Sequence, residues 1–362
     1  MANEALGAGL SRAVLRRAPN RINHVTPIPR RAAGGLVATV YAQVEREFGL
    51  LAPPIMLHSP APAALAAVWV LLRETLLADG VVDRATKEAV ATSVSLANDC
   101  PYCVEVHATA LDGMGHASAE DTIAHRQLDS ISDPSIRTVA AWARESGTPD
   151  HTVTPAVTPA QLSELLGVAT TFHYLNRMVN VFLEDSPLPP AAPSPVRVLA
   201  RRVLGLSLRP TRPIPPGAAA RLLPAAMLPN DLRWARASAP VGTAMARAAH
   251  AIDQAATSSV PESVRDLVTR TVAEWDGTPA GPSRRWARTA VRPLPPGDRA
   301  IGELALLTAL ASHQTSTADI TAVREHGADD RALVELTSWA SMLAARQIAE
   351  RSSHPSTKAA GT

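Results

Sequence analysis

The sequence contains few aromatic residues, and this shortage narrows the classes of fold. Phe, Trp and Tyr make up 3% of the 362 residues, whereas hydrophobic residues reach 46%. The apolar residues are mainly Ala, Leu and Val, a mixture that favours closely packed helices over a β-sandwich. No segment shows a convincing alternation of apolar and polar residues. The composition therefore predicts an all-α protein, and the length predicts two domains.

Long basic runs and long apolar runs are also missing. The formal net charge is +2 without a basic cluster rich in aromatics, which argues against a nucleic-acid partner. The longest apolar run, 61–72, is shorter than the about 20 residues that span a bilayer, so no membrane association is expected. The N-terminal residues lack the order of basic, apolar and small residues of a secretory signal. We therefore expect a cytoplasmic location.

Proline, threonine and glycine signals divide the chain into segments. In the first half they predict helices over 34–49, 62–80, 83–97, 100–113, 134–146 and 158–185. The expected organisation is an extended arm (1–35), a helical redox domain (36–185), a Pro-rich linker around one short basic helix (186–217), a second helical domain (218–352) and a flexible tail (353–362).

The second helical domain resembles the first in sequence. The segment VDRATKEAV (82–90) aligns with VPESVRDLV (260–268), and a rival alignment pairs 83–88 with 298–303. Such correspondences predict a duplicated domain. On the first alignment the residues that replace Cys100, Cys103 and His107 are Thr278, Gly281 and Arg285. On either alignment the second copy lacks the thiols, so we expect it to be degenerate and catalytically silent.

The chain has only two cysteines, Cys100 and Cys103, and His107 follows four positions later. Steps of three and four residues place these side chains on one face of a helix. Cys100 would lie at the helix start, where the helix dipole favours an anion and lowers the pKa of a thiol from about 8.5 toward neutral. His107 could exchange the proton that thiolate chemistry moves.

Three interpretations of this segment compete. The cysteines could be inert buried residues beside a core histidine. A zinc site would need a fourth ligand from a second CxxC or HxxxH pair, which the sequence lacks, so no metal is expected. A redox-active dithiol fits the spacing, the helix start and the neighbouring base, and this interpretation is favoured.

The spacing Glu88, eleven residues, Cys100, two residues, Cys103, three residues, His107 resembles the active-site pattern of a known family. That family is the alkylhydroperoxidase D-like branch of the carboxymuconolactone decarboxylase family, whose members are all-helical CxxC peroxidases. The segments ATALDGMG (108–115) and FHYLNRMVN (172–180) are also similar to it. The resemblance covers roughly 60–185, with a weaker, degenerate match in 230–350.

The resemblance implies a role for each of the four residues. Cys103 would attack the peroxide and become a sulfenic acid, and Cys100 would resolve it as an intramolecular disulfide. Glu88 and His107 would form a proton relay that serves Cys103. The helix-start argument alone would select Cys100 as the first nucleophile; we follow the resemblance because His107 lies one turn from Cys103.

Four further residues are candidates for lining or orienting the site. Tyr102 occupies the position where family peroxidases often carry a histidine, which puts full peroxidase activity in question. His173, Asn176 and Arg177 could line the pocket or order it from a later helix. Their alternative role is helix packing, with Arg177 in a structural ion pair.

The function implied by the resemblance is that of a thiol-dependent peroxidase, an oxidoreductase that uses a hydroperoxide as acceptor. No bound cofactor is expected; an external dithiol reductant, lipoyl or thioredoxin-like, would be the protein partner. Relatives of this kind form homo-oligomers, so self-association is expected. The alternatives are a redox-sensing or scaffold protein without turnover, and a lactone decarboxylase, which would not need a dithiol.

Overall fold

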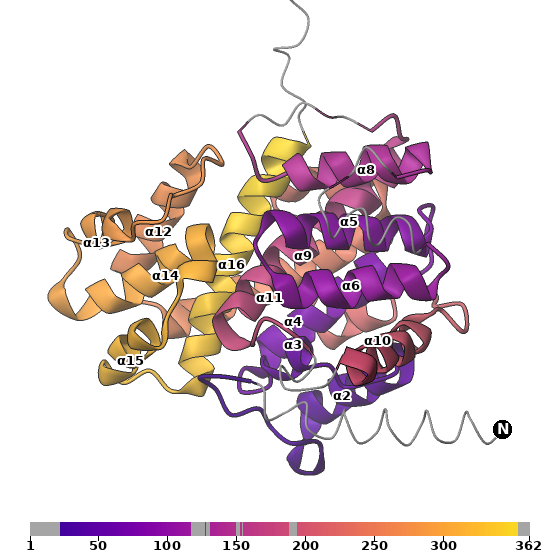
Figure 1. Ribbon diagram of the computed structural model, residues 1–362. Helices are drawn as coiled ribbons and strands as arrows, with labels where there is room; N and C mark the ends of the chain where they lie inside the picture. Colours follow the sequence, from indigo (N-terminus) through magenta and orange to yellow (C-terminus); the bar gives the residue numbers. More distant parts are fainter. Residues whose placement is uncertain are drawn as a thin grey trace, which may run out of the picture.

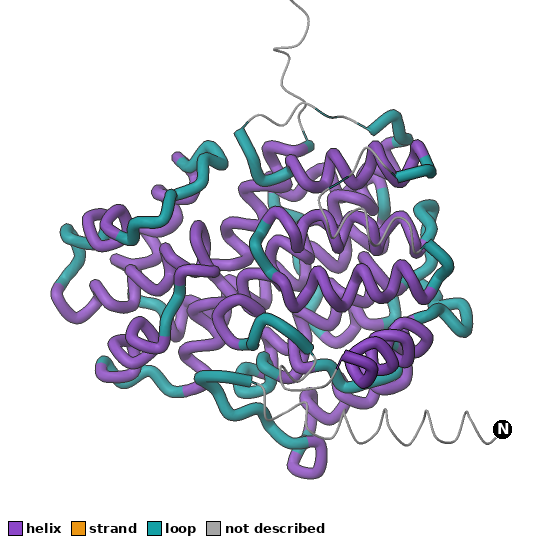
Figure 2. Tube along the Cα trace, in the orientation of Figure 1, coloured by secondary structure: helices purple, strands orange, loops and turns teal. Residues whose placement is uncertain are grey.

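The computed structural model describes residues 22–116, 127, 131–149, 153, 155–187 and 194–353. Within these ranges the regular structure is helical, and the one extended pairing is an isolated bridge between Ile22 and Leu183 (Figures 1 and 2). The all-α prediction is confirmed. Most of the predicted N-terminal arm and all but one residue of the predicted tail lie outside the described residues.

The first half forms the helices expected from its start signals and one short helix, α3, that was not predicted. They are α2 (Gly35–Glu47), α3 (Pro53–Met56), α4 (Pro62–Leu72), α5 (Arg84–Ala97), α6 (Pro101–Gly113), α8 (Pro134–Glu145) and α9 (Pro159–Phe182). Asp83 caps α5 by accepting a hydrogen bond from the Thr86 backbone N–H, and Thr158 with Gln161 forms a capping box at the start of α9. These caps explain why the predicted starts agree with the observed ones.

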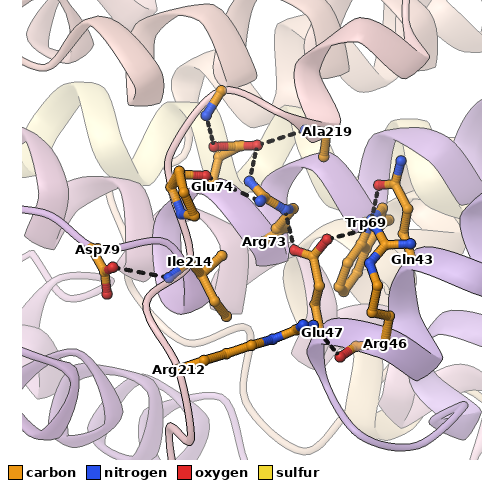
Figure 3. Close-up of polar contacts among 12 residues, drawn as sticks. Gln43, Arg46, Glu47, Trp69, Arg73, Glu74, Asp79, Arg212, Ile214 and Ala219 are labelled. Atoms are coloured by element: carbon orange, nitrogen blue, oxygen red, sulfur yellow. Dashed lines mark hydrogen bonds and ion pairs between the residues drawn. The ribbon is translucent and has the colours of Figure 1, made fainter.

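The predicted helix over 62–80 ends differently from the expectation. After α4 the chain continues as a π-helical turn, Arg73–Leu77, and becomes extended at Ala78. The wider turn closes with a hydrogen bond from the Ala78 N–H to the Arg73 carbonyl. Arg73 and Glu74 are both buried in it, and Arg73 pairs with Glu47 and Glu74 at 2.6 Å each (Figure 3).

This turn holds the end of the Pro-rich segment. The Glu74 carboxylate accepts hydrogen bonds from the backbone N–H groups of Gly217 and Ala219. Asp79 and Ile214 exchange two hydrogen bonds of 2.9 Å (Figure 3). Residues 214–219 are therefore attached to the first half by buried charges and backbone groups.

The remaining helices lie within the linker and after it. They are α10 (Ser194–Leu208), the basic helix expected in the linker, and then α11 (Ala239–Ser259), α12 (Glu262–Glu274), α13 (Arg285–Ala290), α14 (Arg299–Ala311), α15 (Thr317–Glu325) and α16 (Asp330–Ser352). Short 3-10 turns occupy 30–32, 219–222, 230–237, 296–298 and 312–314. None of the described helices combines the length and hydrophobicity needed to cross a membrane.

The two halves share one hydrophobic core. α4 packs against α11 and α9 packs against α16, and the main cluster of buried side chains draws on all four helices (Figure 1). The Tyr174 hydroxyl on α9 lies 2.8 Å from His58 Nε2 and 3.0 Å from Ser338 Oγ on α16. α5 packs between α6, α8 and α9, away from α12–α15 (Figure 1). The cysteine segment therefore lies on the first-half side of this common core.

Candidate active site

A tight connection between α5 and α6 positions the two cysteines. Asp99 adopts a left-handed conformation with φ of 48°, and the Cys100 N–H donates to the Ser95 carbonyl at 3.0 Å. Cys100 is then the residue that precedes α6, and Pro101 occupies the first turn, where a missing N–H costs nothing. The predicted helix start is confirmed.

Both cysteines are free thiols and are almost inaccessible to solvent. Cys100 is 1% exposed and Cys103 is 4% exposed. Burial, together with the neighbouring Cys103, raises the pKa of the Cys100 thiol well above its ordinary value. The expectation that the helix start lowers the pKa of Cys100 is therefore wrong, because desolvation of the thiolate outweighs the helix dipole.

Glu88 of α5 and His107 of α6 are in direct contact. His107 Nδ1 lies 2.6 Å from Glu88 Oε2, and the other carboxylate oxygen pairs with Arg84, one turn earlier on α5, at 2.6 Å. Burial alone would raise the pKa of Glu88, but Arg84 and His107 together outweigh it and lower that pKa. Glu88 is thus a buried carboxylate held in its charged form by two partners.

The neighbouring residues show why Glu88 contacts His107 and is free of the adjacent lysine. Lys87, a possible surface partner of Glu88, instead reaches the Ala78 carbonyl and pairs with Glu164 at 3.3 Å. The His107 ring meets Phe172 of α9 edge to face, with centroids 4.5 Å apart. Phe172 therefore helps fix the orientation of the His107 ring that contacts Glu88.

The four secondary candidates separate into two groups. Tyr102 is buried in the core beside the cysteines. His173 and Asn176 lie near the α5–α6 connection, where Asn98 Nδ2 is 3.1 Å from His173 Nδ1 and 2.9 Å from Asn176 Oδ1. Both are joined to the cysteine segment by hydrogen bonds.

Arg177 has a structural environment. Its guanidinium donates to the Ala309 carbonyl of α14 at 2.8 Å and to the His173 carbonyl at 2.7 Å. Burial lowers the pKa of Arg177 to about 10, so it stays charged at neutral pH. It joins the two halves through backbone carbonyls, and its expected alternative, an ion pair, is not what holds it.

Sequence reasoning missed three polar residues of this region: Ser95, Asn98 and Ser146. Asn98 lies two positions before Cys100 in the segment LANDC, which was a usable signal. Ser146 comes from the end of α8 and has no mark in the sequence. In the described part of the chain, no group of three or more His, Cys, Asp or Glu side chains could hold a metal ion.

Comparisons with known proteins point to one family. The profile of the carboxymuconolactone decarboxylase family matches residues 63–145, a range that includes α5, α6 and both cysteines. An alkyl hydroperoxide reductase of Mycobacterium tuberculosis is 39% identical over 329 residues, which is 90% of this chain and 94% of that protein. The similarity to this relative therefore extends through both halves.

A solved structure also overlaps part of the chain. It is the alkylhydroperoxidase core of an uncharacterised peroxidase-related protein from Ralstonia eutropha. The match covers 43% of this chain and 90% of that chain, with a TM-score of 0.36 and 22% identity.

Proposed function

The chain belongs to the carboxymuconolactone decarboxylase family, in its alkylhydroperoxidase D-like branch, and on this premise we propose that it is a thiol-dependent peroxidase that reduces hydroperoxides. The observation that carries the proposal is the 2.6 Å contact between Glu88 and His107, one helical turn from Cys103. The name of the Mycobacterium tuberculosis relative supports a peroxide as the oxidant.

In the first step the Cys103 thiolate attacks the peroxide. Because His107 Nδ1 is engaged by Glu88, Nε2 is the nitrogen that takes the Cys103 proton. The sulfur then bonds to one peroxide oxygen, the O–O bond breaks, and the proton returns from His107 to the departing alkoxide as an alcohol. The charged Glu88 stabilises the imidazolium that exists between these two transfers.

In the second step Cys100 resolves the Cys103 sulfenic acid. A sulfur–sulfur bond forms, the sulfur–oxygen bond breaks, and the hydroxyl leaves as water with the Cys100 proton. An external dithiol, lipoyl or thioredoxin-like, then reduces the disulfide by thiol–disulfide exchange. No bound cofactor takes part, and Tyr102, with a phenol in place of an imidazole, takes no part in proton transfer.

The test is single-turnover and steady-state oxidation of the reduced protein by cumene hydroperoxide. Wild type should consume one equivalent and form the Cys100–Cys103 disulfide, seen by mass spectrometry. Cys100→Ser should still consume one equivalent but stop at the sulfenic acid. Full turnover by Cys103→Ser would refute the assignment of the nucleophile.

The relay has its own control. Glu88→Gln should lower the rate of Cys103 oxidation at neutral pH by about 10²-fold, the lower end of general acid–base effects. Glu105, an acid on α6 near His107, accepts a hydrogen bond from Ser186 instead, so Glu105→Gln should leave that rate unchanged. Equal rates in the two variants would remove Glu88 from the mechanism.

A second candidate, lactone decarboxylation, follows from the name of the matching family. That reaction needs no dithiol, so a Cys100→Ser/Cys103→Ser protein that still decarboxylates a lactone would favour it. Oxidation by one equivalent of peroxide without turnover under any dithiol would instead favour a redox sensor or scaffold.

A further inference from the structure

A chain of buried hydrogen bonds leads from the end of α8 to the cysteine segment. His173 Nε2 lies 2.8 Å from Ser146 Oγ, and Asn98 Nδ2 lies between His173 Nδ1 and Asn176 Oδ1. Asn176 Nδ2 lies 3.0 Å from Ser95 Oγ. The Ser95 carbonyl also accepts a hydrogen bond from the Cys100 N–H. Asn176 therefore contacts a residue that is itself hydrogen-bonded to Cys100.

The hydroxyl protons of the two serines determine the direction of this chain. Ser95 donates its proton to the Ala91 carbonyl at 2.6 Å, and Ser146 donates its proton to the Ala143 carbonyl at 2.7 Å. Each hydroxyl oxygen must therefore accept from its other neighbour. The Asn176 amide nitrogen accordingly faces Ser95, and His173 carries its proton on Nε2.

His173 keeps this direction because it is neutral. Burial, with the charges of Arg177 and Arg351, lowers its pKa well below the ordinary value. The unprotonated Nδ1 of His173 accepts a hydrogen bond from the Asn98 Nδ2, which lies 3.1 Å away, whereas the Asn98 Oδ1 lies at 3.3 Å. The Asn98 nitrogen must also supply Asn176 Oδ1 at 2.9 Å, so the Asn98 amide has one orientation that serves both neighbours.

We propose that Asn176 donates a hydrogen bond to the Cys100 sulfur and stabilises its thiolate, with Asn98 and His173 as positioning residues. Asn176 is fully buried and Ser95 takes one N–H of its amide, so the second N–H is left for the adjacent Cys100 thiol, where it opposes the effect of burial. The inference rests on the proposed function, in which Cys100 resolves Cys103.

The donor acts at two points of the cycle. During resolution the Cys100 thiolate attacks the Cys103 sulfenic acid, forming the disulfide and releasing water with the Cys100 proton. During reduction an external thiolate attacks the less buried Cys103 sulfur, the disulfide breaks, and Cys100 leaves as a thiolate. At both points Cys100 is a thiolate, as nucleophile in the first and as leaving group in the second, on a sulfur that is 1% exposed, where a fixed donor replaces water.

The second half anchors this chain although it has no cysteine. Ser352 of α16 donates to the Ser146 carbonyl at 2.8 Å, and Arg177 links the His173 carbonyl to α14. The degenerate half therefore fixes the positions from which His173 and Asn176 act.

The first test measures the Cys100 thiolate directly, without peroxide. In a Cys103→Ser background, the absorbance at 240 nm is followed against pH. Adding Asn176→Ala should raise the Cys100 pKa by about one to two units, because a hydrogen bond to a charged acceptor is lost. Asn176→Asp, which keeps the shape but cannot donate, should raise it at least as much.

Asn180 is the matched control, since it lies one turn further on α9 and donates to the Asn98 carbonyl and Ser312. Asn180→Ala and Asn180→Asp should leave the Cys100 pKa unchanged.

The second test follows one turnover in the dithiol protein. Asn176→Ala should form the disulfide about three to ten times more slowly, since the smaller thiolate fraction is partly offset by higher nucleophilicity. The rate of Cys103 oxidation should not change. If Asn176 had only a structural role, its loss would slow both disulfide formation and Cys103 oxidation, or the Asn180 variants would behave like the Asn176 variants. Either result would overturn the proposal.

A third measurement needs no substitution at position 176. In asparagine-labelled Cys103→Ser protein, the Asn176 side-chain amide resonances should move with the midpoint of the Cys100 titration. Resonances that stay fixed through that titration would also overturn the proposal. If wild type does not oxidise Cys103 with peroxide, the proposed function fails, whereas the two titrations still decide the role of Asn176.

Discussion

Glu88 is a charged group enclosed by the protein, and Arg84 is the residue that makes this possible. The Glu88 side chain is 1% exposed and the Arg84 side chain 14%, so water contributes little to solvating the pair. Removing one member of such a pair leaves an uncompensated buried charge. The geometry that positions His107 thus depends on a residue that need not touch the substrate.

We expect Arg84→Met to lower the free energy of unfolding by about 3 kcal/mol at neutral pH, the low end for breaking a buried pair. The lowered pKa of Glu88 stabilises the folded state above the unfolded pKa of about 4.3, and this contribution is lost as the pH falls through the folded pKa. The difference between variant and wild type should therefore shrink on acidification below about pH 4. Urea unfolding at a series of pH values measures it.

Arg30→Met is the control for this experiment. Arg30 pairs with Glu45 at 3.0 Å, but the two side chains are 48% and 41% exposed. Its loss should cost less than about 1 kcal/mol at every pH. A deficit in Arg84→Met that is equally small, or that persists unchanged at low pH, would contradict the account of Glu88.

The sequence predicted the residues that are close along the chain and missed those that come from distant elements. Cys100, Cys103 and His107 could be placed on one face because the helical period alone relates them. The approach of Glu88 to His107 required the resemblance to a family, since the two residues lie on different helices, α5 and α6. Ser146 lies 2.8 Å from His173, yet no local rule connects the end of α8 to the middle of α9.

At the scale of helices, the contact between α6 and α10 depends on two glycines. A Cβ at Gly113 would lie 2.3 Å from the Gly205 carbonyl oxygen, and a Cβ at Gly205 would lie 2.7 Å from the Thr109 carbonyl oxygen. Backbone atoms cannot give way as a flexible side chain can. α10 therefore lies directly on the backbone of the helix that carries the cysteines.

Gly113→Ala should destabilise the protein by about 1–3 kcal/mol, because the added methyl group forces the two helices apart. Gly297→Ala is the control, since Gly297 is exposed and its nearest neighbour, a His326 carbon, would be 3.9 Å from the new Cβ. That variant should unfold within about 0.5 kcal/mol of wild type. Thermal and urea unfolding compare them; equal stability of the two variants would show that α10 yields without cost.

Helix starts were predictable and one helix end was not, for a physical reason. Asp83 and Thr158 satisfy backbone N–H groups with their own side chains, so their effect is local and visible in the sequence. The π-helical turn at Arg73–Leu77 instead coincides with contacts to Glu47 and to residues 215–219, which are remote in the chain. Local signals could not anticipate a turn that distant partners stabilise.

At the scale of the whole molecule, the packing of the two halves follows a similar pattern, as a duplication would predict. α4 pairs with α11 and α9 with α16, while α5 rests on α9 as α14 rests on α16. Asp83 and Asp298 directly precede α5 and α14, which agrees with the alignment of 83–88 with 298–303. The duplication remains a prediction, as does association into homo-oligomers, which size-exclusion chromatography with light scattering would test.

The shared core leads to a prediction about the first half alone. A chain of residues 1–224 would expose the faces of α4 and α9 that pack on α11 and α16, and it would leave the Arg177 guanidinium without the Ala309 carbonyl. A buried charge without its acceptor and a large exposed apolar face are both costly. We therefore expect this fragment to lack a cooperative unfolding transition and a near-ultraviolet circular dichroism signal.

Co-expression with residues 225–362 is the matched control, since the break falls at Pro224 and Ala225, which are both exposed. The paired fragments should recover both signals. A first half that folds and reacts with peroxide by itself would mean that the common core is a contact between independent domains, and the role of the second half in holding His173 would then be lost.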